Sequence, residues 1–436
     1  MKKYTEYKDS GVKWIGQIPS HWEISRIRSV TKVKSIKNKP NERLLSIYRD
    51  YGVIYKDSRD DNHNVASEDL STYKFVEPSD LVINKMKAWQ GSLAISEYQG
   101  IISPAYIICE VSDSIYPRYL HYLLRSKGYI GAYKSISYGV RIGQWDMRYE
   151  DFKKLPLLVP PLEEQKMIAD YLDKKLNEID LLIEIKEKQI ELFKEKQRKI
   201  IDDYILNGIN HKKTKKVDEV WLASIPEDWH LIPLKHIVQE INISRDDIRE
   251  DEIYLSLDRI ESKTGKFKIE DGNVEFDSKV KEFKETDILF NKLRPYLAKV
   301  VFPKRKGVCV GELLVLRPKV KTVLPEYLHY VLLSPSFINL VDSSTYGTKM
   351  PRANWEFIGN QKIPIPRKIE EQKQIVELIK QRTQVIDDFI KYTEEYIAKI
   401  KEYRQTLISN VVTGRFNICH LISKGGEEFA NGYVGA

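Results

Sequence analysis

The sequence predicts an α+β protein in which two globular α/β domains are separated by two long helices packed as an antiparallel coiled coil. Three observations predict this fold class. A stretch of 44 residues, 163–206, lacks proline and glycine and has its apolar residues at the spacing of one helical face. A second stretch repeats this pattern 207 residues later. The segments that precede the two stretches also resemble each other, which indicates a pseudo-twofold internal repeat.

The first long helix is expected from about Glu163 to Leu206. It follows Pro160 and Pro161, which a helix tolerates at its first turn, and Gly208 provides a stop. Its apolar residues recur in steps of three, four or seven: Ile168, Leu172, Leu176, Ile179, Ile183, Ile190, Phe193 and Ile200. At about 1.5 Å per residue this helix is about 66 Å long. An isolated helix cannot bury such a seam, so it needs a partner helix.

The partner helix is expected in the same chain. Glu370-Glu371-Gln372 repeats Glu163-Glu164-Gln165, and Gly414 again provides a stop. The same periodicity continues through Ile375, Ile379, Ile386, Ile390, Ile397, Ile400 and Leu407. Two such seams in one chain predict an antiparallel pair.

The repeat extends over the globular parts. Trp14, Pro19 and Trp22 recur as Trp221, Pro226 and Trp229. Strands are expected at 80–84, 105–111, 287–291 and 313–317, and short helices at 117–126 and 325–334. The lysine-rich segment 207–218 is interpreted as a linker. The expected boundaries are residues 1–161 (domain 1), 162–208 (central helix), 209–368 (domain 2), 369–415 (second helix) and 416–436 (a flexible tail).

Net charge is +8, but it is unevenly distributed. The two helical stretches carry −3 and −1, so the remainder carries +12. Such a distribution favours globular parts that contact a polyanion, although solubilising charge is the plain alternative. Three widely spaced cysteines fit a reducing, cytoplasmic setting. No apolar run is long enough for a membrane span.

Catalytic motifs are missing from the sequence. It contains no phosphate-binding Gly-x4-Gly-Lys-Ser/Thr loop, no dinucleotide fingerprint and no metal-spaced histidine pair. His121 and His329 occupy equivalent positions on apolar helices and are interpreted as structural. The pattern therefore indicates a binding protein that is not an enzyme by itself.

Two segments in each domain combine cations, aromatic rings and amides, which suit phosphate contact and base readout. The first is 84–90, answered by 291–296, and the second is 138–145, answered by 346–355. Ordinary solvent-exposed loops are the alternative interpretation. The candidate DNA-binding residues are Lys85, Lys87, Trp89, Gln90, Arg141, Gln144, Lys292, Arg294, Tyr296, Lys349, Arg352 and Asn354.

These features together resemble a known family. The duplicated Trp-x4-Pro-x2-Trp opening, a basic module, the Pro160-Pro161 entry and Glu-Glu-Gln at a long helix start are similar to the specificity subunit of type I restriction-modification systems. The resemblance covers residues 10–416. The second copy departs at 367–369, where Arg-Lys-Ile replaces the proline pair.

The resemblance implies that each domain reads one half of a bipartite, asymmetric double-stranded DNA site. It also implies docking of two methyltransferase and two restriction subunits, which would bind S-adenosylmethionine, ATP and magnesium, so this chain is expected to hold no cofactor. The specificity subunit of a fused methyltransferase-nuclease system is a close variant of this hypothesis. A coiled-coil scaffold with two protein-binding heads is the alternative of another class; it predicts no salt-sensitive DNA affinity.

Overall fold

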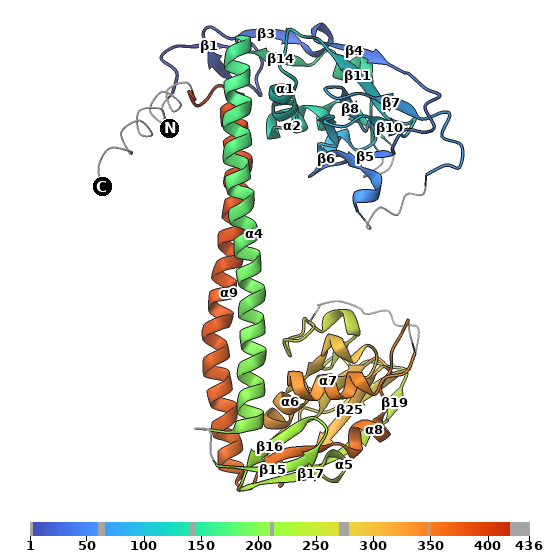
Figure 1. The fold of residues 1–436 in the computed structure, drawn as a ribbon, viewed down its shortest axis with the longest axis vertical. Coiled ribbons are helices and arrows are strands. Elements are labelled where there is room, and N and C mark those ends of the chain that lie inside the picture. The colour runs from blue at the N-terminus through green and yellow to red at the C-terminus, as the bar shows by residue number, and fades with distance from the viewer. Residues whose placement is uncertain are drawn as a thin grey trace. The chain divides into compact units, whose positions relative to one another are not determined.

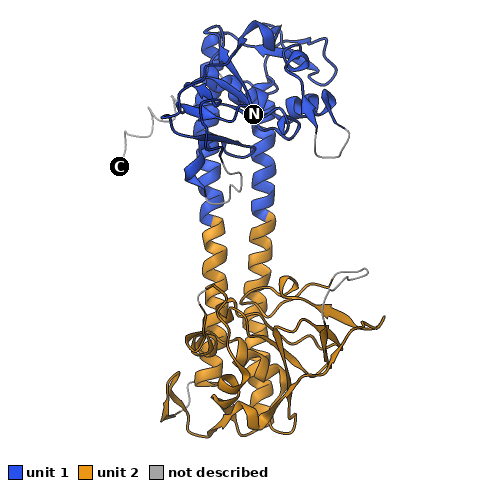
Figure 2. Cartoon of the chain, turned by 90° about the vertical axis from the view of Figure 1, so that its right-hand side faces the viewer, with its two compact units in different colours: residues 1–185, 396–436 blue, residues 186–395 orange. Residues whose placement is uncertain are grey.

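A computed structural model describes residues 3–59, 66–139, 145–209, 213–269, 279–347 and 349–418. The chain divides into two compact units, residues 1–185 with 396–436 and residues 186–395 (Figure 2). Each unit contains one α/β module and parts of two long helices, α4 (Leu162–Asn207) and α9 (Ile369–Val412) (Figure 1). Both helices begin one residue before the glutamate that was predicted to start them.

The module of the first unit is built on a four-stranded antiparallel sheet. Its strand order is β4 (Thr31–Lys34), β11 (Ile107–Val111), β8 (Leu81–Ile83) and β9 (Leu93–Ile95). Helices α1 (Pro117–Leu124) and α2 (Lys127–Ser135) share one hydrophobic core with this sheet. The strands predicted at 80–84 and 105–111 and the helix predicted from Pro117 are therefore confirmed.

Further strands of the first unit form two-stranded antiparallel pairs. These are β1 (Tyr7–Asp9) with β2 (Gln17–Pro19), β3 (Glu23–Arg26) with β14 (Pro156–Val159), β5 (Leu45–Tyr48) with β6 (Gly52–Tyr55), β7 (Lys74–Val76) with β10 (Gly100–Ile102), and β12 (Ser137–Tyr138) with β13 (Asp146–Met147). The short helices are α3 (Tyr149–Phe152), η1 (Ile27–Ser29), η2 (Lys56–Ser58) and η3 (Ala88–Gln90).

The second unit repeats the first sheet strand for strand. Its order is β18 (Val238–Ile241), β25 (Leu313–Pro318), β22 (Ile288–Asn291) and β23 (Val300–Val301), again antiparallel. Helices α6 (Pro325–Leu333) and α7 (Pro335–Ser343) correspond to α1 and α2. This shared topology confirms the internal repeat that the sequence predicts.

The second unit also contains a further four-stranded sheet and several shorter elements. A second sheet has the order β19 (Ser244–Arg245), β21 (Val280–Phe283), β24 (Gly307–Cys309) and β20 (Ile253–Leu255), with β20 and β24 parallel. The remaining elements are β15 (Thr214–Glu219), β16 (Leu222–Pro226), β17 (Trp229–Pro233), β26 (Lys362–Pro366), α5 (Leu234–Ile237), α8 (Trp355–Asn360), η4 (Leu257–Arg259) and η5 (Pro295–Leu297).

The linker predicted over residues 207–218 is wrong in its second half. Residues 214–219 form β15, which pairs with β16, and Lys215 lies opposite Ile225. Its side chains alternate between exposed and half-buried, the pattern of an edge strand, where lysine is tolerated. The Lys215 ammonium donates to the backbone oxygens of Glu227 and Trp229 at 2.8 and 2.7 Å. The opening of each module is therefore a hairpin, since β1 and β2 pair in the same way.

The two long helices pack against each other within each unit. In the first unit, Arg404 of α9 binds Asp180 of α4 through both carboxylate oxygens, at 2.8 and 3.0 Å. In the second unit, the Gln197 amide of α4 donates to Asp387 of α9 at 2.9 Å. Because the residue number rises along one helix as it falls along the other, the pair is antiparallel, as predicted.

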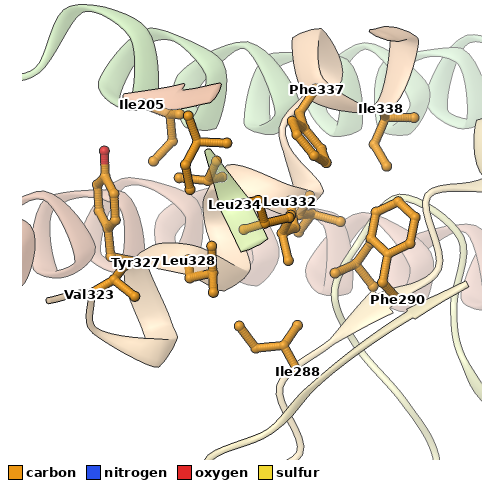
Figure 3. Packing of buried hydrophobic residues seen from close by; sticks show 14 of the residues in the cluster. Ile205, Leu234, Ile288, Phe290, Val323, Tyr327, Leu328, Leu332, Phe337 and Ile338 are labelled. Atoms are coloured by element: carbon orange, nitrogen blue, oxygen red, sulfur yellow. The ribbon is translucent and has the colours of Figure 1, made fainter. Parts of the chain in front are cut away.

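The predicted apolar seam lies in the hydrophobic cores. In the first unit, Ile168 and Leu172 of α4 pack with Leu407 of α9 and with module residues. In the second unit, Ile205 of α4 joins the core formed by α6, α7 and β22, where Tyr327, Leu328, Leu332, Phe337, Ile288 and Phe290 meet (Figure 3). Each module is thus packed onto a helix through one continuous core.

Candidate nucleic-acid interface

In the first module, the two predicted DNA-binding segments lie next to each other. Residues 84–90 form the turn after β8, which ends in η3, and the described residues of 138–145 are Tyr138 at the end of β12, Gly139 and Trp145 just before β13. The backbone N–H of Met147 donates to the Lys85 carbonyl at 3.0 Å. The rings of Trp89 and Trp145 lie 5.2 Å apart between centroids. Segments about 55 residues apart in the sequence therefore meet at one surface, a proximity that the sequence analysis did not predict.

The candidate side chains of this surface differ in what they contact. Lys85 pairs with Asp146 at 3.3 Å, whereas Lys87 and Gln90 are exposed. The Trp89 indole N–H donates to the Met86 carbonyl at 3.1 Å, which fixes the ring within the turn. The candidates Arg141 and Gln144 lie outside the described residues.

In the second module, the two corresponding segments are also joined. The Arg294 N–H donates to the Pro351 carbonyl at 2.7 Å, and the Ala353 N–H to the Lys292 carbonyl at 2.9 Å. Arg294 has φ of +51°, a left-handed conformation that residues other than glycine rarely adopt. Its guanidinium donates to the Lys349 carbonyl at 3.3 Å, so the strained turn is held by the facing segment.

The remaining candidates of the second module are partly engaged. Lys349 is exposed, and Tyr296 is 44% exposed. Arg352 pairs with Glu312 at 2.5 Å. The Asn354 side-chain oxygen accepts from the Phe357 N–H at 2.7 Å and so caps α8, which leaves its amide nitrogen as the group that can donate to a base.

Two carboxylates at these surfaces were missed by the sequence analysis. Asp146 and Glu312 each neutralise a candidate cation, and each has a second oxygen that is buried without a hydrogen-bond partner in the described part of the chain. Only the tertiary structure brings Glu312 beside Arg352, 40 residues away. The signal at Asp146 was its place directly after Trp145.

The Glu-Glu-Gln motif attaches each module to its helix, a role that the sequence analysis did not assign. The second glutamate accepts the indole N–H of the second tryptophan: Trp22 donates to Glu164 and Trp229 to Glu371, each at 3.1 Å. Both indoles are fully buried. The two copies therefore attach the module to the long helix in the same way. This shared contact explains why the tryptophan of the module opening and the Glu-Glu-Gln motif at the helix start recur together.

The glutamine of the motif binds the residue that precedes the first helix of each module. Gln165 accepts from the Tyr116 N–H at 2.7 Å, and Gln372 accepts from the Leu324 N–H at 2.9 Å. Tyr116 and Leu324 are the N-cap residues of α1 and α6. One motif therefore orients the first helix of each module.

The two equivalent histidines are structural, as predicted. Burial lowers the pKa of His329 to about 4 and that of His121 well below its usual value, so both are neutral. The His329 imidazole N–H donates to the Val300 carbonyl at 3.3 Å.

Within the described ranges, no group of three or more His, Cys, Asp or Glu side chains has a metal-binding arrangement. Among the same residues, no helix has the length and apolarity to cross a membrane.

The fold and this surface define a duplicated protein with two similar modules, each presenting paired basic segments. Comparison with known proteins shows which family this is. The model of the type I restriction modification DNA specificity domain matches residues 19–192 and 226–402. The chain belongs to this family, and as a specificity subunit it supplies DNA sequence recognition and not catalysis.

Two relatives cover three quarters or more of the chain. The type I restriction enzyme MjaVIII specificity subunit of Methanocaldococcus jannaschii is 26% identical over 95% of this chain and 98% of the relative. The EcoDI specificity subunit of Escherichia coli is 24% identical over 75% of this chain and 76% of its own length. A chain from a structural study of complex assembly and conformational transition in the type I system superposes on this chain with a TM-score of 0.64 at 14% identity. The superposition covers 91% of this chain and 98% of that chain, and it supports the fold described above.

Proposed function

We propose that the chain recognises a bipartite, asymmetric double-stranded DNA site, with one half-site read by each module. The observation that carries this proposal is the repeated surface. Each module joins the turn after its β8 or β22 strand to a second basic segment, but the polar side chains differ between the copies. One scaffold with two sets of side chains suits two different half-sites.

Exposed cations favour phosphate contact at both surfaces. Lys87 and Lys349 are exposed, and Lys85, Lys292, Arg294 and Arg352 flank them. Each phosphate that is neutralised adds about −0.9 to the slope of log affinity against log salt, so six contacts give about −5. Replacing Lys87 or Lys349 by alanine should reduce the slope by about 1 each, whereas the control Lys154→Ala, in an exposed ion pair with Asp151, should leave it unchanged.

Exposed apolar residues on the long helices support docking of partner subunits. In the second unit, Val385, Tyr392 and Leu192 are 70%, 66% and 58% exposed. In the first unit, Leu181, Ile185 and Tyr403 are 56%, 54% and 50% exposed. Apolar side chains in such number on the outer face of a helix pair fit contact with further helices.

The proposed assembly contains two methyltransferase and two restriction subunits. In this proposal those partners bind S-adenosylmethionine, ATP and magnesium, this chain holds no cofactor, and the complex works in the cytoplasm. The absence of a recognisable cofactor motif from the sequence supports this division of labour.

The test is co-expression with the adjacent methyltransferase gene, followed by mapping of methylated adenines in host DNA. A split motif with two short defined halves is the expected result. Exchanging residues 10–160 with 217–366 should then exchange the halves. No methylation, together with no salt-dependent DNA binding by the purified complex, would favour a coiled-coil scaffold instead.

A further inference from the structure

The first unit contains a pocket of about 280 Å³ beside the start of α2. Its walls come from the N-terminal hairpin, the first turn of α2 and the last turns of α9. They are formed by Trp14, Ile15, Ser126, Lys127, Gly128, Thr406, Ser409, Asn410, Thr413 and Arg415. The walls contain two cations, Lys127 and Arg415, and no acidic side chain. Neither cation pairs with a carboxylate of the described residues.

Two hydroxyl groups at this pocket lack partners. Ser126, 1% exposed, is the N-cap residue of α2, yet it makes no side-chain capping bond. Its hydroxyl oxygen and that of Ser409 are buried without a hydrogen-bond partner in the part of the chain that the structure describes. The first N–H groups of an α-helix also have no partner inside the helix. The pocket thus gathers donors and positive charge around an unfilled volume.

The second copy of the repeat shows what occupies the corresponding place. There α7 corresponds to α2, and the Asp202 carboxylate of α4 lies at its N-terminus. Asp202 accepts from the backbone N–H of Ser336 at 3.1 Å and from its hydroxyl at 2.6 Å. Ser334, the counterpart of Ser126, caps α7 by accepting from the Phe337 N–H. This helix N-terminus is therefore satisfied by a carboxylate of the protein itself.

The two sites are structurally equivalent. Trp221 packs edge-on against Phe337 of α7 at 5.5 Å, as Trp14 packs against Tyr129 of α2 at 5.0 Å. The repeat offset of 207 relates Asp202 to Ser409. In the first unit a serine therefore replaces the carboxylate, and the pocket lies where the carboxylate would be.

We propose that the pocket of the first unit binds an oxyanion, a carboxylate or phosphate group, at the position that Asp202 fills in the second unit. The group would accept from the first N–H groups of α2 and from the Ser126 and Ser409 hydroxyls, with Lys127 and Arg415 balancing its charge. A water molecule occupies about 30 Å³ in the liquid, so the pocket has room for a ligand that extends beyond one carboxylate and contacts the Trp14 ring. This site is separate from the proposed DNA surface, because it uses none of those residues.

The test uses inorganic phosphate as the probe and the thermal unfolding of the full chain as the readout. Phosphate is titrated at constant ionic strength against chloride, in wild type and in Ser409→Asp. Wild type should show a saturable rise of Tm with phosphate. The aspartate should place a carboxylate at the N-terminus of α2, as Asp202 does at α7, raise Tm in chloride and abolish the saturable rise. General stabilisation by phosphate is common to both proteins and cancels in the comparison.

Two further variants keep the test independent of one substitution. Lys127→Ala, at an exposed position, should weaken phosphate binding about threefold to tenfold, whereas Lys154→Ala should not change it. Asp202→Ser should create a second phosphate-responsive site. An equal phosphate response in wild type and Ser409→Asp, or no response beyond chloride in wild type, would overturn the proposal.

Repeating the titration with the methyltransferase complex identifies the source of the anion. Loss of the response in the complex, with retention in the free chain, assigns the site to an acidic group of the partner subunit. A response in both states assigns it to a free anion. The proposed DNA recognition is tested by methylation mapping, so either proposal can fail alone.

Discussion

Replacing Glu164 should loosen the attachment of the first module to α4. This side chain is 6% exposed and accepts three hydrogen bonds. They come from the Trp22 indole at 3.1 Å, the Tyr4 hydroxyl at 2.5 Å and the His21 imidazole at 2.8 Å. In Glu164→Ala the Trp22 N–H, at 0% exposure, would have no acceptor.

The expected cost follows from these contacts. A buried donor left without a partner costs about 1–3 kcal/mol, and hydrogen bonds to charged groups lie at the upper end. The Glu164→Ala change should therefore cost about 3 kcal/mol, a factor of about 100 in the local opening equilibrium. In a double-mutant cycle with Trp22→Phe, the coupling energy should be about 1.5–3 kcal/mol, because the cycle cancels the cavity left by the smaller ring.

Native-state hydrogen exchange by mass spectrometry is the suitable assay, because a chain of two units does not unfold in two states. Peptides around Trp22 and α1 should exchange about 100-fold faster in Glu164→Ala. The matched control is Glu163→Ala, whose exposed pair with Lys166 contributes less than about 1 kcal/mol. Equal exchange in the two variants, or a coupling energy below about 0.5 kcal/mol, would refute this reasoning.

Three further predictions concern other parts of the chain. Asp287→Ala should cost about 3 kcal/mol, because Asp287 is fully buried and binds Arg317 at 2.7 and 2.6 Å; breaking the exposed Asp57 pair should cost less than about 1 kcal/mol, and native-state hydrogen exchange measures both. The free energy of unfolding of the second unit should be greatest above pH 6.5 and should fall by about 1 kcal/mol between pH 6.5 and 5.5. In this range the unfolded state protonates His329, whereas the folded state, with a pKa of about 4, does not. His329→Gln should flatten this dependence of stability on pH. Four residues inserted after Lys188, about one helical turn, should change the spacer in the methylated motif and leave both half-sites intact; altered half-site bases would contradict a spacer role.

Sequence reasoning succeeded where the signal is local or repeated. Periodicity placed α4 and α9 to within two residues, because a helical face follows from spacing alone. Repetition identified both pairs of candidate segments, although not their contact. Residues 214–219 were misassigned because lysine-rich composition indicates a loop, whereas pairing with β16 makes them an edge strand. The tryptophan–glutamate bonds span 142 residues and follow from no local pattern.

The internal repeat offers a further test that neither copy provides alone. Where both copies keep a contact, as Glu164 and Glu371 do with their tryptophans, the contact serves the shared fold. At Ser409 the first unit has a hydroxyl where the second has the Asp202 carboxylate, and the Ser126 and Ser409 hydroxyls are buried without a partner among the described residues. A fold requirement would have closed the gap with apolar side chains, since unpaired buried donors cost free energy. These partnerless hydroxyls therefore point to a ligand of the first unit, which the Ser409→Asp variant would displace.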